Sequence, residues 1–366
     1  MKRASFFLLC ILFAFAVASC APSSSGKNGN SNLPDPASFR QQDSADFFIE
    51  TEEYYYYLLD GKVYFSQKDN LAFYILCSKP DCKHNDDSCN ASARSVLGYW
   101  DGHLYGDVLS VSDSKLYAFR MNLDGTEHKR IAEFEMPVNP MGSAGGMFML
   151  YVHDGYIYYS VSNIGMNSLL RLNLSTGENE RLFEGFLHGE TSIHPRICFD
   201  GQEFYFLLYD QNERTLYGVN TETLELREIR QWSDEILHWS VYGNTLYYYA
   251  KDRKTFCEYN LTTGEEQTFL QLDYYSGAAF YDSDYVYLIT WDDDEWSDRG
   301  LSIFDRNYQF IQRIELPGDM NFMYDAQDKL IFTTIPSQKA TKYLPKSAIG
   351  TGEAELLPIE DPYSYR

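Results

Sequence analysis

A ten-residue sequence motif, called here the ten-residue phrase, recurs with substitutions along this 366-residue chain. In its clearest version, Leu169–Glu178, a short apolar run leads into an Asn- and Gly-containing turn and then a polar run. Each copy follows a second recurring phrase, an aromatic run broken by a turn such as Asp154-Gly155. A repeat of this kind constrains the architecture strongly, because each unit must stack on its neighbours to bury its apolar faces. The five copies are Leu116–Gly125, Leu169–Glu178, Leu216–Glu225, Phe256–Glu265 and Leu301–Phe310.

The spacing of the turns predicts blades of four β-strands. The turns recur at intervals of about 40 to 53 residues, which is the range of propeller repeats. Between them the apolar periodicity is two rather than 3.6, as in Tyr156–Val161 and Thr245–Ala250. We therefore expect an all-β β-propeller with seven four-stranded blades, or six if the irregular end units are incomplete. The turns are Asp60-Gly61, Asp101-Gly102, Asp154-Gly155, Asp200-Gly201, Gly243-Asn244, Asp282-Ser283-Asp284 and Asp325–Asp328.

Three details of the repeat lead to further expectations. Each turn is expected to follow the innermost strand of its blade. The segment Phe47–Glu50 is expected to form an outer strand of the last blade and so to close the ring. Stacking between blades accounts for the 31 tyrosines without a ligand. Cys198 and Cys257 lie inside strand-like runs and are expected to be buried core residues.

The start of the chain has the pattern of an export signal. Lys2 and Arg3 precede an apolar stretch, and Val17-Ala18-Ser19-Cys20 ends it with small residues before a cysteine. This ending resembles the lipobox of bacterial lipoproteins, which implies that Cys20 carries the lipid. We expect a signal peptide at 1–19, lipidated Cys20 with a flexible polar tether at 20–45, and one propeller domain at 46–366. The alternative is an ordinary signal peptide with a chance cysteine.

The repeat also resembles a known group of bacterial propellers. Phrases such as Leu169–Glu178 are similar to those that join the outer two strands in TolB-like and YVTN/PQQ-like propellers. With its lipobox, polar tether and tyrosine-rich blades, the chain looks like lipoproteins of anaerobic, Clostridia-like Gram-positive bacteria. This resemblance implies the fold and an exported, lipid-anchored location, and it does not imply PQQ as a cofactor.

The charge of the chain disfavours nucleic acid as a partner. The 53 Asp and Glu outnumber the 30 Lys and Arg, which gives a formal net charge of −23. An acidic surface without a basic cluster repels the phosphate backbone. We expect a monomer that meets the membrane only through the lipid on Cys20.

The repeat is interrupted by a loop, residues 77–89, that is rich in metal-ligand side chains. Cys77, Cys82, His84 and Cys89 supply three thiols and an imidazole, which is a complete tetrahedral set for a structural Zn²⁺. The spacing does not match the common zinc fingers. The alternative is a disulfide, Cys82–Cys89 or Cys77–Cys89, because exported thiols are usually oxidised.

A second group of candidates lies where innermost strands begin. In this register His194, Arg196, His238 and Trp239 would converge on one mouth of the central channel and offer a cation, imidazoles and a stacking plane. The competing interpretation is that they are ordinary capped or solvated side chains at strand starts.

The sequence contains no Gly-x-Ser-x-Gly, no His-Glu-x-x-His and no Gly-rich phosphate loop, and no catalytic residue is assigned. We therefore expect a non-catalytic binding or scaffolding module for an extracellular protein, peptide or glycan, anchored on the outer face of a bacterial membrane. One alternative is a propeller-type hydrolase or lyase that acts on carbohydrate at the channel mouth. Another is a structural role in the envelope through the side walls of the blades.

Overall fold

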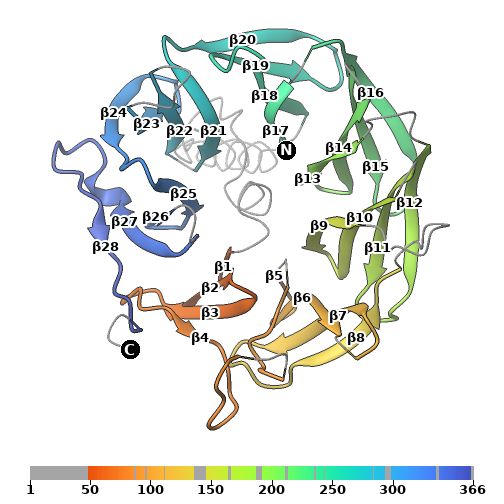
Figure 1. Ribbon diagram of the computed structural model, residues 1–366. Helices are drawn as coiled ribbons and strands as arrows, with labels where there is room; N and C mark the ends of the chain where they lie inside the picture. Colours follow the sequence, from red (N-terminus) through yellow and green to blue (C-terminus); the bar gives the residue numbers. More distant parts are fainter. Residues whose placement is uncertain are drawn as a thin grey trace, which may run out of the picture. The chain divides into compact units, whose positions relative to one another are not determined.

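Seven four-stranded antiparallel sheets make up the described part of the chain, and they surround a central axis as the blades of a propeller (Figure 1). Hydrogen-bonded order follows chain order within every sheet, so each sheet is one blade, numbered here from 1 to 7. The prediction of an all-β propeller with seven blades is confirmed. Cys20 and the predicted signal peptide and tether lie outside the described residues. The computed structural model describes residues 48–85, 88–94, 97–110, 112–135, 146–163, 166–186, 192–210, 213–234, 236–242, 244–282, 284–292, 298–334 and 338–363.

The strands run in order from the inner to the outer edge of each blade. Blades 1 to 4 contain β1 (Phe48–Glu50), β2 (Tyr54–Leu59), β3 (Lys62–Gln67), β4 (Tyr74–Ile75), β5 (Leu97–Trp100), β6 (His103–Ser110), β7 (Lys115–Asn122), β8 (Lys129–Glu133), β9 (Gly146–His153), β10 (Tyr156–Asn163), β11 (Met166–Asn173), β12 (Asn179–Phe186), β13 (Ser192–Asp200), β14 (Glu203–Asp210), β15 (Glu213–Asn220) and β16 (Leu226–Trp232). Blades 5 to 7 contain β17 (Ile236–Tyr242), β18 (Thr245–Ala250), β19 (Thr255–Asn260), β20 (Glu266–Gln271), β21 (Tyr275–Tyr281), β22 (Tyr285–Trp291), β23 (Gly300–Asp305), β24 (Phe310–Glu315), β25 (Met320–Asp325), β26 (Lys329–Thr334), β27 (Ala340–Pro345), the 3₁₀ helix η1 (Lys346–Ala348) and β28 (Leu357–Pro358). Among the described residues, no helix has the length and apolar character needed to cross a membrane.

The ten-residue phrase forms the third strand of a blade and the turn into the fourth. In blade 3, the side-chain oxygen of Asn173 accepts hydrogen bonds from the amides of Ser175 and Thr176, at 2.8 and 3.0 Å. Asn220 and Asn260 cap the equivalent turns of blades 4 and 5 in the same way. The repeated Asn is therefore a local signal, because its side chain replaces backbone partners that the turn leaves open.

The Asp-Gly turns close the hairpins between strands. In blade 3, Asp154 and Gly155 connect β9 to β10 with φ angles of 44° and 78°. Two successive positive φ angles are the geometry of a type I′ turn, whose twist matches that of the flanking strands. The expected hairpin chemistry is confirmed at this position.

Apolar side chains fill the space between neighbouring blades. The described residues form seven buried clusters, and each cluster combines side chains from two successive blades, including the pair of blades 7 and 1. Tyrosines such as Tyr57 and Tyr159 are fully buried in these clusters, and Cys198 and Cys257 are buried between blades 4 and 5. Burial of one large apolar side chain contributes about 2 kcal/mol. The expected packing role is confirmed for these buried tyrosines and for both cysteines.

The ring closes differently from the prediction for Phe47–Glu50. Phe48 begins β1, the innermost strand of blade 1, and the outer strand of blade 7 is β28 from the C-terminal segment. Successive side chains point to opposite faces of β1, so Ile49 packs toward blade 2 while Phe48 stacks on Tyr324 of blade 7, with ring centroids 4.0 Å apart. Among the described strands, closure therefore depends on packing between blades and not on a shared sheet.

Because β1 is the innermost strand of blade 1, the turn of this blade lies one strand later than predicted. The Asp60-Gly61 turn joins β2 to β3, and so it follows the second strand of its blade rather than the innermost one. The expectation of an innermost strand before each turn is wrong for blade 1. In the other blades, the corresponding turns do follow the innermost strands, as Asp101-Gly102 follows β5. The short β1 has only three residues, and the periodic signal of so short a strand is weak.

Candidate metal centre and ligand pocket

The Cys- and His-containing loop connects β4 of blade 1 to β5 of blade 2. Backbone hydrogen bonds tie its C-terminal part to both blades: the amide of Ala93 donates to Gly61 at 3.2 Å, and the amide of Arg94 donates to Asp107 at 2.8 Å. The ammonium of Lys62 in β3 also donates to the hydroxyl of Ser92, at 2.7 Å. The loop is therefore a bridge between two blades.

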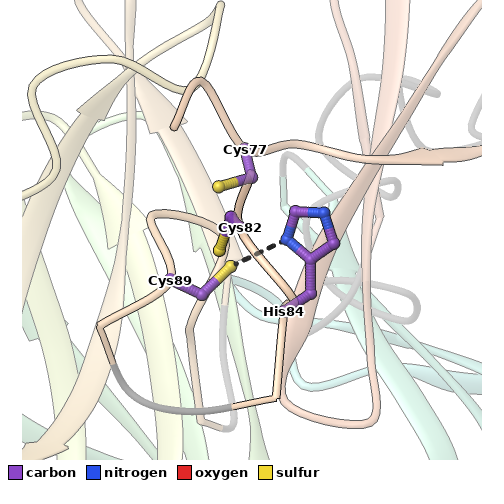
Figure 2. A group of neighbouring side chains, drawn as sticks. All are labelled: Cys77, Cys82, His84 and Cys89. Atoms are coloured by element: carbon purple, nitrogen blue, oxygen red, sulfur yellow. Dashed lines mark hydrogen bonds between the residues drawn. The ribbon is translucent and has the colours of Figure 1, made fainter. Parts of the chain in front are cut away.

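The four candidate ligands of this loop converge. The thiols of Cys77, Cys82 and Cys89 and the imidazole of His84 point toward one another (Figure 2), and their ligand atoms lie within 4.8 Å of one another. His84 Nδ1 is 3.3 Å from the Cys89 sulfur. A tetrahedral zinc with Zn–S bonds of about 2.3 Å holds its ligand atoms roughly 3.8 Å apart. The four ligand atoms would therefore need to move only slightly closer together to coordinate an ion.

The three thiols are free, and neither predicted disulfide is formed in the structure. Their environments differ. Burial raises the pKa of Cys77, but backbone hydrogen bonds from Lys79 and Asn90 and contacts with the other thiols outweigh it, so the pKa falls below its usual value. Burial, reinforced by the neighbouring thiols, raises the pKa of Cys89 to about 12. A metal ion would bind these thiols as thiolates, with the imidazole as a fourth ligand.

The cluster is fastened to blade 2 at one carbonyl group. The hydroxyl of Ser78 and the side-chain amide of Asn90 both donate to the carbonyl oxygen of Gly125, at 2.9 and 3.0 Å. Gly125 lies in the turn between β7 and β8 with a φ of +78°, and a Cβ there would meet the Leu76 carbonyl oxygen at 3.1 Å. The close approach of this turn to the loop therefore requires glycine.

We expect Gly125→Ala to destabilise the protein more than a glycine substitution with backbone strain alone. The positive φ costs about 1 kcal/mol, and the contact with the Leu76 backbone adds roughly 1–2 kcal/mol. Gly102→Ala is the matched control, because Gly102 has a φ of +76° and nothing within 4 Å of the added Cβ. Urea unfolding of both variants measures the difference, and equal losses of stability would show that the loop does not press on this turn.

The predicted channel-mouth residues are not brought together as one described site. His194 and Arg196 lie on β13 in an irregular stretch between Ile193 and Ile197, and their side chains are outside the described part of the structure. His238 and Trp239 occupy a bulge in β17 between Leu237 and Ser240. A bulge re-aims side chains locally, so His238 is exposed beside Tyr249 while the next residue points inward.

Trp239 requires a correction. Its side chain is 0% exposed and packs in the apolar cluster between blades 4 and 5. The predicted stacking plane is therefore wrong for this residue, because an indole enclosed by the core offers no face to a ligand. A binding role for His194, Arg196 and His238 stays a prediction.

A pocket that the sequence did not reveal lies where blades 1 and 2 meet, beside the Cys/His cluster. Its volume is about 530 Å³, and Cys77 forms part of its wall. Its aromatic lining consists of Tyr54, Tyr56, Phe65 and Tyr99, and its acidic lining of Glu52, Glu53 and Asp124. We call it the blade 1–2 pocket. The one sequence signal for it is the run of two glutamates followed by four tyrosines at 52–57, which stacking between blades also explains.

Comparisons with known proteins identify the fold. No protein-family model matches the chain, and a search of curated proteins finds no match either. Among solved structures, a chain from a study of two prolyl endopeptidases aligns with a TM-score of 0.59 and 12% identity, over 90% of this chain and 52% of that one. The tricorn protease aligns with a TM-score of 0.57 and 8% identity, over 90% and 35%. A puromycin hydrolase aligns with a TM-score of 0.55 and 10% identity, over 91% and 56%.

This chain thus spans about a third to somewhat over half of the length of these structures. At such low identities the likeness shows the propeller fold alone, because one fold hosts many unrelated functions.

Proposed function

We propose that this protein is an exported propeller that binds an extracellular protein, peptide or glycan without transforming it, and that a lipid on Cys20 holds it at the outer face of the cell membrane. The blade 1–2 pocket supports the binding role. Its volume of about 530 Å³ is within the usual range for ligand sites. Apolar walls with a few polar groups at one side are also typical of such sites.

We also propose that Cys77, Cys82, His84 and Cys89 hold a structural Zn²⁺. Four protein ligands complete a tetrahedral shell and leave no open position for a substrate. The ion would fasten the loop that carries Cys77, which lines the pocket, and the loop is already tied to blade 2 through the carbonyl of Gly125. Zinc would therefore support the pocket wall without taking part in any reaction.

Retention of envelope components tests the binding role. Immobilised protein is incubated with the solubilised envelope fraction of the source cells, and retained proteins and glycans are identified by mass spectrometry. Tyr99→Ala alters the pocket, and Tyr74→Ala is the matched control because Tyr74 is 44% exposed, Tyr99 is 41% exposed, and only Tyr99 lines the pocket.

We expect at least one component to be retained by the unaltered protein and by Tyr74→Ala but not by Tyr99→Ala. The same set of components on all three proteins would overturn the proposed use of this pocket. Conversion of a retained glycan to smaller products would instead support the alternative of a hydrolase or lyase.

The lipid anchor predicts a specific modification. We expect cells that express the protein to incorporate an alkyne-labelled fatty acid into it, and Cys20→Ala to abolish the label and to move the protein from the membrane fraction to the medium. In-gel detection of the label measures this, with Cys257→Ala as the control that keeps Cys20. A label that persists in Cys20→Ala would place the lipid elsewhere, and an absent label in every variant would favour an ordinary signal peptide.

A further inference from the structure

Four aromatic residues line the blade 1–2 pocket, and their rings are inclined to one another. The rings of Tyr54 and Tyr56 lie with their centroids 6.2 Å apart at an interplanar angle of 47°, and those of Tyr54 and Phe65 lie 6.2 Å apart at 53°. Tyr99 of β5 adds a ring from blade 2. Alternation along β2 places Tyr54 and Tyr56 on one face, and Phe65 is the cross-strand partner of Tyr56. The pocket is thus lined by rings at several inclinations rather than by one flat surface.

The ring of Tyr56 is held firmly in this arrangement. Its hydroxyl donates to the carbonyl oxygen of Leu123, at 3.1 Å, and so it joins blade 1 to the β7–β8 turn of blade 2. The residue is buried, and burial raises its pKa above the usual range, with further contributions from Tyr54 and Asp124. Tyr56 therefore stays neutral and holds β2 against blade 2. Its own ring is enclosed, so the aromatic surface open to a ligand comes from the less buried Tyr54, Phe65 and Tyr99.

The charges that line the pocket are all negative. Glu52 and Glu53 lie in the β1–β2 turn and Asp124 in the β7–β8 turn, all three are exposed, and no Lys, Arg or His lines the pocket among the described residues. Within the same part of the chain, neither Glu52 nor Glu53 forms an ion pair. The pocket thus combines aromatic faces with uncompensated negative charge, and both attract a cation.

We propose that the blade 1–2 pocket binds a quaternary ammonium cation, such as choline, that carries no anionic group of its own. This inference rests on the proposed binding function and adds the chemical class of the ligand. The negative faces of aromatic rings attract cations, and the attraction is strongest for cations that lose little hydration on entry. A tetraalkylated nitrogen fits this requirement because it donates no hydrogen bonds to water, whereas a primary ammonium is strongly hydrated.

The size and charge of the pocket narrow the ligand further. A volume of about 530 Å³ leaves room for a trimethylammonium group together with part of the neutral molecule that carries it. A carboxylate or phosphate next to the cation would be repelled by Glu52, Glu53 and Asp124. Choline should therefore bind more tightly than glycine betaine or phosphocholine, although all three carry the same cationic group.

The test is a titration of the purified protein with choline, with binding measured by isothermal titration calorimetry and by ligand-observed NMR. The comparison ligands are 3,3-dimethylbutan-1-ol, which is the neutral isostere of choline, and glycine betaine, which adds a carboxylate. Cosedimentation with phosphatidylcholine vesicles distinguishes a lipid headgroup from a free cation. We expect choline to bind at least about tenfold more tightly than either comparison ligand, with no cosedimentation.

Two substitutions locate the binding in the pocket. Tyr99→Ala should weaken choline binding about tenfold, and Glu53→Gln several-fold, because each removes an attraction for the cation. Tyr74→Ala, a tyrosine of similar exposure outside the pocket, should leave the affinity unchanged. A melting curve for each variant shows that it is folded.

The possible outcomes separate this inference from the proposed function. Equal affinity for choline and its neutral isostere, or choline binding that Tyr99→Ala does not change, would overturn the inference. If no choline binds but an envelope component is still retained through Tyr99, the ligand class is wrong and the binding function stands. If vesicles are bound and free choline is not, the ligand is a lipid headgroup and the inference is wrong.

Discussion

His84→Ala and Cys82→Ser should each reduce the zinc content from about one ion per chain to nearly none and lower the melting temperature by roughly 5–10 °C. An ion that binds only the folded state stabilises it by about 4 kcal/mol when its concentration is 1,000-fold above the dissociation constant. In a domain of this size each kilocalorie per mole corresponds to about 2 °C. Both side chains are only half-buried, so their loss leaves little cavity in the core. Elemental analysis and thermal unfolding, with and without a chelator, measure the two effects.

The matched control is Cys257→Ala, which removes a thiol that is buried between blades 4 and 5. It should keep its zinc even if packing is weakened. Hydrogen exchange adds a local measurement: chelation should lower protection of the amides of Ser92 and Ala93, which donate to Cys89 and Gly61. A metal-free protein with a mapped Cys82–Cys89 or Cys77–Cys89 bridge would show that the disulfide alternative is correct.

Lys346→Met should destabilise the protein by about 3–5 kcal/mol at pH 7, because it leaves two buried carboxylates without their cation. The ammonium of Lys346 in η1 lies 2.8 Å from Asp282 of blade 6 and 2.5 Å from Asp325 of blade 7. All three side chains are mostly buried, and Tyr287 also donates to Asp282. Urea unfolding measures the loss.

The matched control for Lys346 is Lys339→Met. Lys339 pairs with Asp361, and both side chains are about one-third exposed, so its loss should cost less than about 1 kcal/mol. A triple variant, Lys346→Met with Asp282→Asn and Asp325→Asn, should recover most of the stability because no unpaired charge remains. An equal cost for Lys346→Met and Lys339→Met would contradict the role of this buried network.

The pH dependence provides a separate check on the same network. Burial alone would raise the pKa of Asp282, but Lys346 and hydrogen bonds from Tyr287 and from the amide of Asp284 outweigh it, so the pKa falls below its usual value. A lowered pKa means that Asp282 stabilises the fold fully above the unfolded value of about 3.9 and loses this contribution as the pH falls further. Without Lys346, the largest influence that lowers this pKa is lost, and only the hydrogen bonds from Tyr287 and the Asp284 amide still oppose burial. The deficit of Lys346→Met should therefore be largest at pH 7 and shrink toward pH 4.

Much of the fold could be predicted because its signals are local. Asn173 caps a turn with its own side chain, and Asp154-Gly155 forms a hairpin turn through its φ angles. Each turn can therefore be recognised from a few residues of sequence. The four ligands of the Cys/His cluster lie within one short loop, and proximity in the chain was enough to group them. The prediction for blade 1 is wrong because the three residues of β1 carry too little periodicity.

Other features could not be predicted because they depend on which blades become neighbours. The sequence position of Trp239 predicts a ligand-stacking side chain, but the bulge in β17 directs the indole into the core. Asp282 and Asp325 look like ordinary turn residues, yet Lys346 joins them across two blades.

The sequence by itself determined the repeat, the turn chemistry and the grouping of the Cys/His cluster, because hydrogen bonds and periodicity over a few residues specify them. It narrowed the number of blades to six or seven. Only the tertiary structure decided how the ring closes, which aromatic side chains are enclosed, and that rings and carboxylates from blades 1 and 2 line one pocket. The physical reason is that stacking of blades is non-directional apolar burial, which requires many aromatic residues but does not specify which of them stays open to a ligand. Many tyrosines of the aromatic runs are buried between blades, whereas Tyr54 and Tyr99, at the junction of blades 1 and 2, line the pocket together with acidic side chains.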